Sequence, residues 1–319
     1  MVENNRIFQK TFRVIRISIM KLFFSYLFVL SFLSCADGIA QKAPTKSLSE
    51  EFRTYWYAGD AEISRYELKQ ARYGEIHEGD AVLIFVTEDF DTKEQVKYER
   101  GDKKNVTSVL KLNTTRKFNT GIYPYSLMSS TFTPVSNDPS IKVTTSSQEW
   151  CGHTYSQLNL TKSGYSGMLH SYFQNEADQE IKIGKALLED EIWAKIRLSP
   201  EQLPLGNIQL IPGNLFLRLS HYDYKIENAV ASMEDVVVSG KDLKKYTITY
   251  KDIKRKLTIT FEKSFPYAIE GWEEESISGY GSKAKTLTTS AKRTHHIKSP
   301  YWSKHGLKDA GLRKELGLD

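Results

Sequence analysis

The chain has 319 residues, of which 40 % are hydrophobic, 26 % charged and 12 % aromatic, with a net charge of +5. This composition is typical of a globular body with enough chain for a large core, and it excludes collagen, a disordered chain and a membrane protein with many spans. Of that net charge, +4 lies before Cys35, so the remaining chain is nearly neutral and lacks the field that attracts nucleic acid.

An uncharged, nearly continuous apolar run of twelve residues, Leu22–Leu33, follows Met20 and Lys21. It is shorter than the roughly 20 residues that cross a bilayer, and a basic start followed by such a run is typical of a signal peptide. We therefore predict that residues 1–34 are a signal peptide and that the protein is exported. Met20 is an alternative start codon, which would leave residues 1–19 as an upstream extension.

Two cleavage sites fit this leader. Residues 32–35 resemble a bacterial lipobox, in which Cys35 is lipidated and becomes the new N-terminus, whereas Gly38–Ala40 has the small residues of ordinary cleavage before Gln41. We favour lipidation, because Cys35 lies where the apolar run ends. Residues 35–47, which are polar and contain proline, are then a flexible tether. The sequence thus predicts a protein on the periplasmic side of the cell envelope, held to the membrane by its N-terminal lipid.

Residues 48–319 are expected to form a single β-rich domain. Ser47–Glu50 has a capping-box pattern and is followed by apolar residues at helical spacing as far as Trp56, which predicts a short helix. A second helix is predicted near Lys185–Leu198, where apolar residues repeat every four positions, and a third at Leu307–Leu316.

Strand patterns dominate the rest of the domain. Ala81–Val86 is typical of a strand buried on both faces, and Leu215–Leu219 alternates as one buried sheet face requires. Residues 246–250 and 257–261 predict a hairpin whose basic tip, Lys251–Lys256, is solvated. Further strands are predicted at residues 106–112, 125–135, 141–150, 226–238, 265–275 and 283–297. This series predicts a mainly β fold, a large curved antiparallel sheet of half-barrel or barrel-like form with a few short helices.

The candidate site of the sequence is Cys151 with His153. The chain has two cysteines, and a lipidated or removed Cys35 leaves Cys151 without an intramolecular partner. On a strand, the two side chains would share a face but lie about 7 Å apart, so an ion pair would need a turn at Gly152. A cysteine nucleophile normally meets a histidine from elsewhere in the chain. We favour the alternative of a buried structural thiol, and assign no catalytic residue.

No motif predicts a metal or cofactor site. His295 and His296 adjoin in a strand pattern, so their side chains are expected on opposite faces. Glu273–Glu275 is expected at a solvated strand end or in a loop. The sequence has no Gly-rich phosphate loop, GxSxG elbow or HExxH motif, and we expect neither a cofactor nor a metal.

Several strings resemble those of one protein family. They are Tyr55–Gly74, Phe118–Ser126, Ser147–His153, Phe265–Trp272 and Leu312–Leu318. Over residues 47–319 the chain resembles an exported family of Bacteroidota, mainly flavobacteria, that is commonly labelled "septum formation inhibitor Maf". The resemblance supports export and implies no particular activity.

Maf enzymes themselves are cytoplasmic nucleotide pyrophosphatases with an α/β fold and a Ser-rich turn that ends in paired arginines. This chain has no two adjacent arginines and begins with an export leader. No Maf catalytic residue is carried over, and a nucleoside triphosphate pyrophosphatase or septum formation inhibitor is the disfavoured alternative.

The primary functional hypothesis is a non-enzymatic envelope protein that binds an apolar or amphipathic ligand or an envelope partner. By analogy of fold alone, the strand series is similar to half-barrel proteins that handle lipids. The alternatives are an exported enzyme with an unrecognised site and a structural envelope lipoprotein. A deep pocket lined by Tyr, Phe and Leu would favour the first hypothesis, convergent titratable side chains the second, and a filled sheet interior the third.

Overall fold

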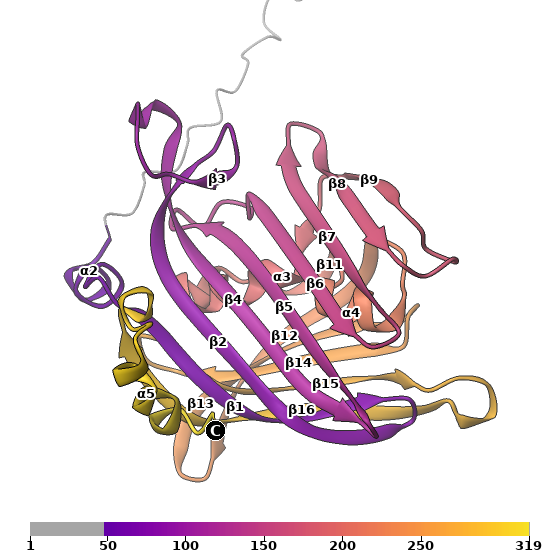
Figure 1. The fold of residues 1–319 in the computed structure, drawn as a ribbon. Helices are drawn as coiled ribbons and strands as arrows, with labels where there is room; N and C mark the ends of the chain where they lie inside the picture. The colour runs from indigo at the N-terminus through magenta and orange to yellow at the C-terminus, as the bar shows by residue number, and fades with distance from the viewer. Residues whose placement is uncertain (1–47, 319) are drawn as a thin grey trace, which may run out of the picture. The chain divides into compact units, whose positions relative to one another are not determined.

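The strands of the described chain join in one sheet that bends back on itself without closing (Figure 1). The computed structural model describes residues 48–318, which belong to one compact unit, Leu48–Asp319. The predicted signal peptide and tether lie outside the described residues. Because this unit contains its own hydrophobic core, it meets the physical requirement for folding alone.

The described residues contain sixteen strands, fifteen of which follow one path across the sheet. In sheet order they are β10 (Leu187–Leu188), β11 (Gly206–Ile211), β12 (Glu227–Val238), β13 (Lys241–Tyr250), β14 (Arg255–Glu262), β15 (Ile269–Ser278), β16 (Lys285–Ser299), β1 (Ala61–Arg72), β2 (Glu75–Asp91), β4 (Val106–Thr120), β5 (Tyr123–Pro134), β6 (Lys142–Glu149), β7 (Gly152–Thr161), β8 (Gly164–Ser171) and β9 (Gln179–Gly184). β3 (Val96–Lys97) pairs with β2 off this path. All described pairs are antiparallel except β10 with β11. The mainly β, curved-sheet prediction is confirmed.

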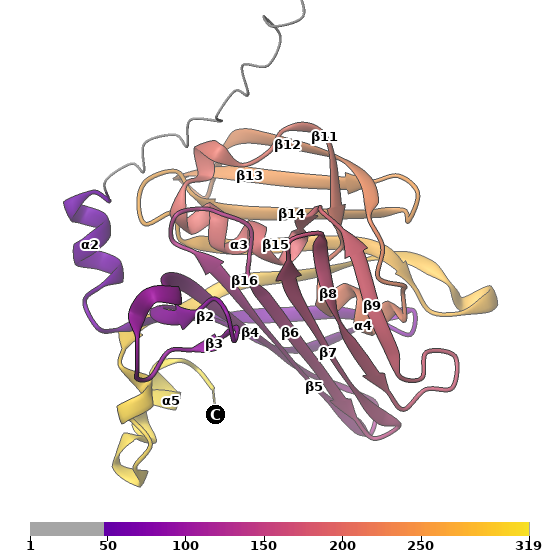
Figure 2. The ribbon, with the colours of Figure 1, turned by 90° about the horizontal axis from the view of Figure 1, so that it is seen from above.

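Two short helices occupy the space that the curved sheet encloses. Figure 2 shows α3 (Glu189–Leu198) and α4 (Asn214–Ser220) between the layer of β4 to β8 and the layer of β12 to β15. The main core cluster joins apolar residues of the inner sheet face, such as Tyr66 and Ile259, to Ile192 of α3. A second cluster packs Leu158 and its neighbours against Phe216 of α4. Each such fully buried side chain contributes about 1.5–3 kcal/mol.

The outer face is covered only locally. α5 (Gly311–Glu315) is followed by Leu316, which packs with Ile63 of β1 and with Val82 and Val86 of β2. Leu83 and Phe85 of the same strand belong to the inner core. The strand over Ala81–Val86 is therefore buried on both faces, as predicted. No helix within residues 48–318 is long and apolar enough to cross a membrane.

The predicted helices are confirmed with shifted ends. α2 (Glu50–Trp56) begins after Ser49, whose Oγ accepts a hydrogen bond of 3.1 Å from the Phe52 amide, so the cap is Ser49 rather than Ser47. α3 starts at Glu189, because Leu187 and Leu188 are used by β10. The C-terminal segment forms a 3-10 turn followed by α5.

The strand predicted at Leu215–Leu219 is wrong, because these residues form α4. The segment lies inside the curved sheet, and every residue from Asn214 to Leu219 is buried. Asp190 accepts hydrogen bonds of 3.2 and 3.0 Å from the Asn214 amide at the start of the helix. A short run buried on all sides gives the same apolar pattern in a strand and in a helix.

Candidate functional site

Cys151 and His153 lie at a hairpin tip, where His153 borders only a small cavity of about 10 Å³. Cys151 is exposed in the turn between β6 and β7, and so is Trp150 before it. The predicted buried thiol is therefore wrong, because the strand ends at Glu149. A hydrogen bond to the Glu149 carboxylate raises the pKa of the Cys151 thiol. Within the described residues no hydrogen bond joins Cys151 to His153, which pairs with Gln148 across the ladder.

The interior of the sheet contains a buried ionic network. Arg255 of β14 donates two hydrogen bonds to Glu189 of α3, the second at 2.7 Å from Nη2 to Oε1. Its Nε donates to Glu274 of β15 at 3.1 Å. Arg116 of β4 lies 3.6 Å from Glu274, and the Tyr250 hydroxyl donates to Glu189 at 2.5 Å. The network thus ties α3 to strands on both sides of the fold.

Two predictions about charged segments are corrected by this network. Arg255 belongs to the predicted solvated tip Lys251–Lys256, and Glu274 to the predicted solvated segment Glu273–Glu275, but both are buried. The pairing makes this burial tolerable, because an isolated buried charge is very costly. Two small cavities, of about 30 and 130 Å³, border the network. The curved sheet is therefore filled by helices and paired charges rather than by a deep apolar cavity.

A second buried ion pair lies toward α2. Arg197 of α3 donates two hydrogen bonds to Glu62 of β1, one of them 2.6 Å from Nη2 to Oε2. The Tyr55 hydroxyl also donates to Glu62. Burial raises the pKa of Glu62, but the charge and hydrogen bonds of Arg197 outweigh it and lower this pKa below its usual range. The pair contacts Tyr55 and Pro266, which line an open recess.

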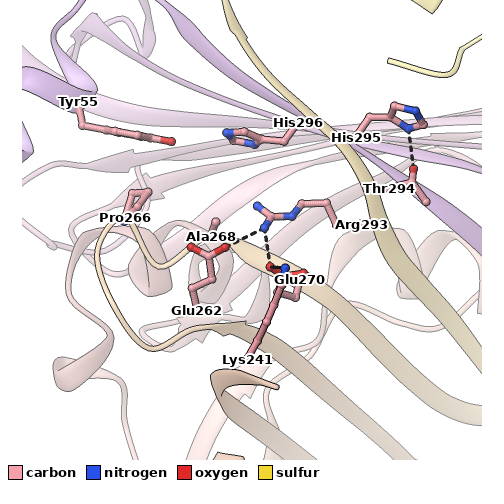
Figure 3. Close-up of a pocket in the computed structure, with 10 residues that line it drawn as sticks. All are labelled: Tyr55, Lys241, Glu262, Pro266, Ala268, Glu270, Arg293, Thr294, His295 and His296. Carbon is pink, nitrogen blue, oxygen red and sulfur yellow. Dashed lines mark hydrogen bonds and ion pairs between the residues drawn. The ribbon is translucent and has the colours of Figure 1, made fainter. Parts of the chain in front are cut away.

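The recess opens on the inner face at this end of the sheet and has a volume of about 470 Å³ (Figure 3). Its charged part consists of side chains from β13 to β16, and its apolar part of residues from α2 and from the β14–β15 connection. The lining residues are Tyr55, Lys241, Glu262, Pro266, Ala268, Glu270, Arg293, Thr294, His295 and His296. A volume of this size is within the range of small-molecule sites.

The charges of the recess are already paired. Arg293 donates from Nη2 to Glu262 at 2.8 Å and to Glu270 at 2.5 Å. Lys241 donates to Glu270 at 3.1 Å. Burial raises the pKa of Glu270, but Lys241 and Arg293 outweigh it and lower this pKa. Two cations therefore face two carboxylates, and the recess carries no formal charge of its own.

His296 is exposed on the recess surface, and its Nδ1 lies 2.9 Å from the Ser64 hydroxyl. Partial desolvation of the ring lowers its pKa, so the imidazole is neutral at pH 7. His295 points away from His296 and contacts Thr294 (Figure 3). The predicted divergence of the two rings is confirmed.

The sequence reasoning missed this recess because its residues converge through an irregularity. β16 shifts register against β1 at Thr294, so that Arg293 pairs with Tyr66 and His295 with Arg65. The extra residue puts Arg293 and His296, three positions apart, on the same face, which a regular strand would not do. Glu262 and Glu270, three residues before and three after Phe265–Tyr267, are a sequence signal that could have indicated the recess.

Two other features complete the survey. A larger groove of about 740 Å³ runs along β11 and β12 beside Lys251 and Asp252, with amide and aliphatic side chains. Among residues 48–318 no three His, Cys, Asp or Glu side chains are grouped so that they could hold a metal ion. The recess differs from the groove in that several charged and aromatic side chains converge on it.

Comparison with known proteins gives two distant likenesses of fold. No family model and no curated protein matches the chain. It is similar to a β-barrel-like protein of a domain of unknown function, DUF1849, from Brucella abortus, with 9 % identity, a TM-score of 0.44, and coverage of 75 % of this chain and 98 % of that one. It is also similar to a putative outer membrane lipoprotein-sorting protein domain from Vibrio parahaemolyticus, with 9 % identity, a TM-score of 0.21, and coverage of 82 % and 92 %. Likenesses this distant identify neither ligand nor activity.

Proposed function

We propose that this chain is an exported, lipid-anchored protein of the bacterial envelope and a non-enzymatic binding module for an amphipathic ligand. The leader before Cys35 supports the location. The filled sheet interior agrees with the structural alternative; the observation that carries the binding role is instead the mixed recess at the end of the inner face, with paired charges on one side and Tyr55, Pro266 and Ala268 on the other. The resemblance to the exported Bacteroidota family agrees with this location.

The balance of charge in the recess restricts the ligand. Lys241 and Arg293 offset Glu262 and Glu270, so a strongly anionic or cationic ligand would meet as much repulsion as attraction. A zwitterionic or uncharged polar head can use donors and acceptors together. The adjoining Tyr55 ring and Ala268 suit a short apolar part of the same molecule. A purely apolar ligand would leave the charged side without partners.

An enzymatic role has one observation in its favour, the contact between Ser64 and His296. A serine nucleophile needs an adjacent base, which the imidazole could supply. Ser64 is however buried, so its hydroxyl has no access to a substrate. The disfavoured pyrophosphatase alternative meets a further difficulty, since the single antiparallel sheet differs from the α/β fold of Maf enzymes. Residues 48–319 should release no pyrophosphate from nucleoside triphosphates with divalent metal.

Ligand binding is tested with a variant that fills the recess. His296→Trp places a large ring where the imidazole faces the open volume, whereas Lys292→Trp makes the same addition at an exposed position of β16. We expect lysophosphatidylcholine, a zwitterionic single-chain amphiphile, to bind residues 48–319 in calorimetry below its micelle concentration. His296→Trp should weaken this binding about ten-fold or more, and Lys292→Trp less than about two-fold.

The same two variants give a test with native material. Protein purified from the envelope should carry an amphipathic molecule that mass spectrometry of an organic extract detects. This molecule should be depleted from His296→Trp and retained by Lys292→Trp. Absence of binding by the unaltered protein in both experiments, or equal binding by the two variants, would refute the proposal.

A further inference from the structure

Six turns of the sheet lie along one rim, on the side away from α2 and α5 (Figure 1). One of them joins β13 to β14 and carries the exposed Lys251, Asp252 and Lys254. The other five join β15 to β16, β1 to β2, β4 to β5, β6 to β7, and β8 to β9. Alternate turns of an antiparallel meander necessarily fall on the same side. These five joined pairs occupy consecutive places in the sheet, so their tips form a continuous row.

These tips carry apolar side chains where turns usually carry small polar residues. The exposed fractions are 66 % for Tyr280, 83 % for Ile122, 68 % for Trp150 and 76 % for Tyr172. Each belongs to a different tip, and the half-buried Tyr73 occupies the fifth, between β1 and β2. We call the set of Tyr73, Ile122, Tyr123, Trp150, Tyr172 and Tyr280 the aromatic rim.

The residues of the aromatic rim contact one another from tip to tip. The Tyr73 ring lies 6.3 Å from that of Tyr280, and its hydroxyl lies 3.3 Å from the Tyr123 hydroxyl. The Tyr123 ring stacks on Trp150 with 6.2 Å between centroids. Tyr172 lies against the backbone of Gly152, where a Cβ would come within 2.7 Å of its ring. The row is thus built before any partner binds.

The half-buried Arg72 lies beneath the row and supports it. The Arg72 guanidinium lies 4.4 Å from the centroid of the Tyr73 ring and donates to the Leu219 carbonyl of α4. The Tyr73 and Tyr125 hydroxyls are 2.6 Å apart. Tyr125 is buried and stacks on Phe118. The rim therefore has a fixed base, and its exposed rings lose little freedom on binding.

The five tips of the aromatic rim are electrically balanced. Their turn residues, 73–74, 121–122, 150–151, 172–178 and 279–284, include the charged residues Glu176, Asp178 and Lys283. Glu176 is paired with Arg218, which leaves one exposed anion and one cation. The neighbouring β13–β14 tip adds two exposed lysines and one aspartate. The connection from β2 to β4 at the opposite rim, residues 92–105, contains eight charged residues, so exposed apolar residues are concentrated along the five tips.

We propose that the aromatic rim docks on the surface of a lipid bilayer and inserts its tips into the interface. Trp and Tyr prefer the region between headgroups and acyl chains, because their rings are apolar and their N–H or O–H groups remain hydrated. Separate protruding tips can enter such a layer, whereas a protein partner would bury a broad fitted surface. The balanced charge of the five tips matches an uncharged or zwitterionic surface, and the β13–β14 tip beside them adds only one net positive charge. The inference rests on the proposed envelope location and adds a second membrane contact to the expected lipid at Cys35.

Vesicle binding tests the proposal on residues 48–319, which lack the anchor. Large phosphatidylcholine vesicles are sedimented with the protein, and tryptophan emission is recorded. We expect the protein to partition to the vesicles with a blue shift from Trp150. The triple variant Ile122→Ser, Trp150→Ser, Tyr172→Ser should lower the partition coefficient about ten-fold or more.

A matched triple variant changes exposed apolar residues elsewhere: Val237→Ser, Trp302→Ser, Leu307→Ser. It should bind within about two-fold of the unaltered protein, and both triple variants should keep the thermal unfolding midpoint of the unaltered protein.

Replacing half of the lipid by phosphatidylglycerol should change binding less than about two-fold. Failure of the unaltered protein to bind, as expected if the rim serves a protein partner, would overturn the proposal. Equal binding by the two triples would do the same. His296→Trp should bind vesicles normally, so failure of the rim is distinguished from failure of the recess.

Discussion

Arg255→Met tests whether the buried network holds α3 inside the sheet. The substitution removes two hydrogen bonds to Glu189 and one to Glu274, all with an ionised donor and acceptor. Both carboxylates stay buried, and Arg116, at 3.6 Å from Glu274, then has to compensate them alone. Breaking a buried ion pair from one side costs about 3–5 kcal/mol. We expect the free energy of unfolding to fall by this amount at pH 7.

The assay is urea unfolding followed by tryptophan fluorescence, since Trp272 is buried in the same core. Lys256→Met is the matched control, because Lys256 is the next residue and is exposed; its effect should be within about 0.5 kcal/mol. The double variant Glu189→Leu, Arg255→Met removes one unpaired buried carboxylate together with the cation. It should recover at least about half of the unfolding free energy that Arg255→Met alone loses.

The stability loss caused by Arg255→Met should depend on pH in a defined direction. Burial raises the pKa of Glu274, but the charges of Arg255 and Arg116 outweigh burial and lower this pKa. The stabilisation from this pairing is therefore present above the unfolded pKa and is lost as the pH falls. The loss caused by Arg255→Met should therefore shrink as the pH falls from about 7 toward 4. A loss no greater than that of Lys256→Met, or one that grows toward low pH, would refute the reasoning. If Arg255→Met fails to fold, Arg255→Lys keeps the charge with fewer bonds and should show a smaller loss of the same sign.

Three further predictions concern single groups. Burial raises the pKa of Asp190 from 3.8 to about 6, so the stabilisation from the protonated carboxyl is present below the unfolded pKa and is lost as the pH rises to about 6. Asp190→Asn should remove this change, of up to about 3 kcal/mol, in the free energy of unfolding measured with urea. An unchanged pH dependence in this variant would contradict the prediction. The exposed Cys151 thiol should be alkylated without denaturant, but more slowly at pH 7 than free cysteine, and Glu149→Gln should accelerate it; protection until global unfolding would be inconsistent with the structure. Intact-mass analysis should find a lipidated N-terminus at Cys35 in the membrane fraction, and Cys35→Ala should release the protein; a mature N-terminus at Gln41 would remove the anchor from the proposal.

The sequence by itself determines the class of this fold, because local patterns carry that information. Period-two alternation at residues 246–250 and 257–261 is sufficient for a hairpin, and it appears as β13 and β14. The continuous apolar run Ala81–Val86 likewise shows that a strand is covered on both faces. The four-residue repeat before Leu198 predicts α3 in the same way. Each of these signals lies within one element, so no knowledge of its neighbours is needed.

Tertiary structure decides the features that depend on contacts with elements distant in the chain. The sequence patterns predict solvated charges at Arg255 and Glu274, whereas the fold places Arg255 between Glu274 of β15 and Glu189 of α3. Leu215–Leu219 becomes a helix because the sheet encloses it on all sides. Arg293 and His296 meet in the recess only because β16 gains one residue against β1. Partners in these cases come from strands far apart in the chain, and a single sequence read along its length contains their pattern but not their pairing.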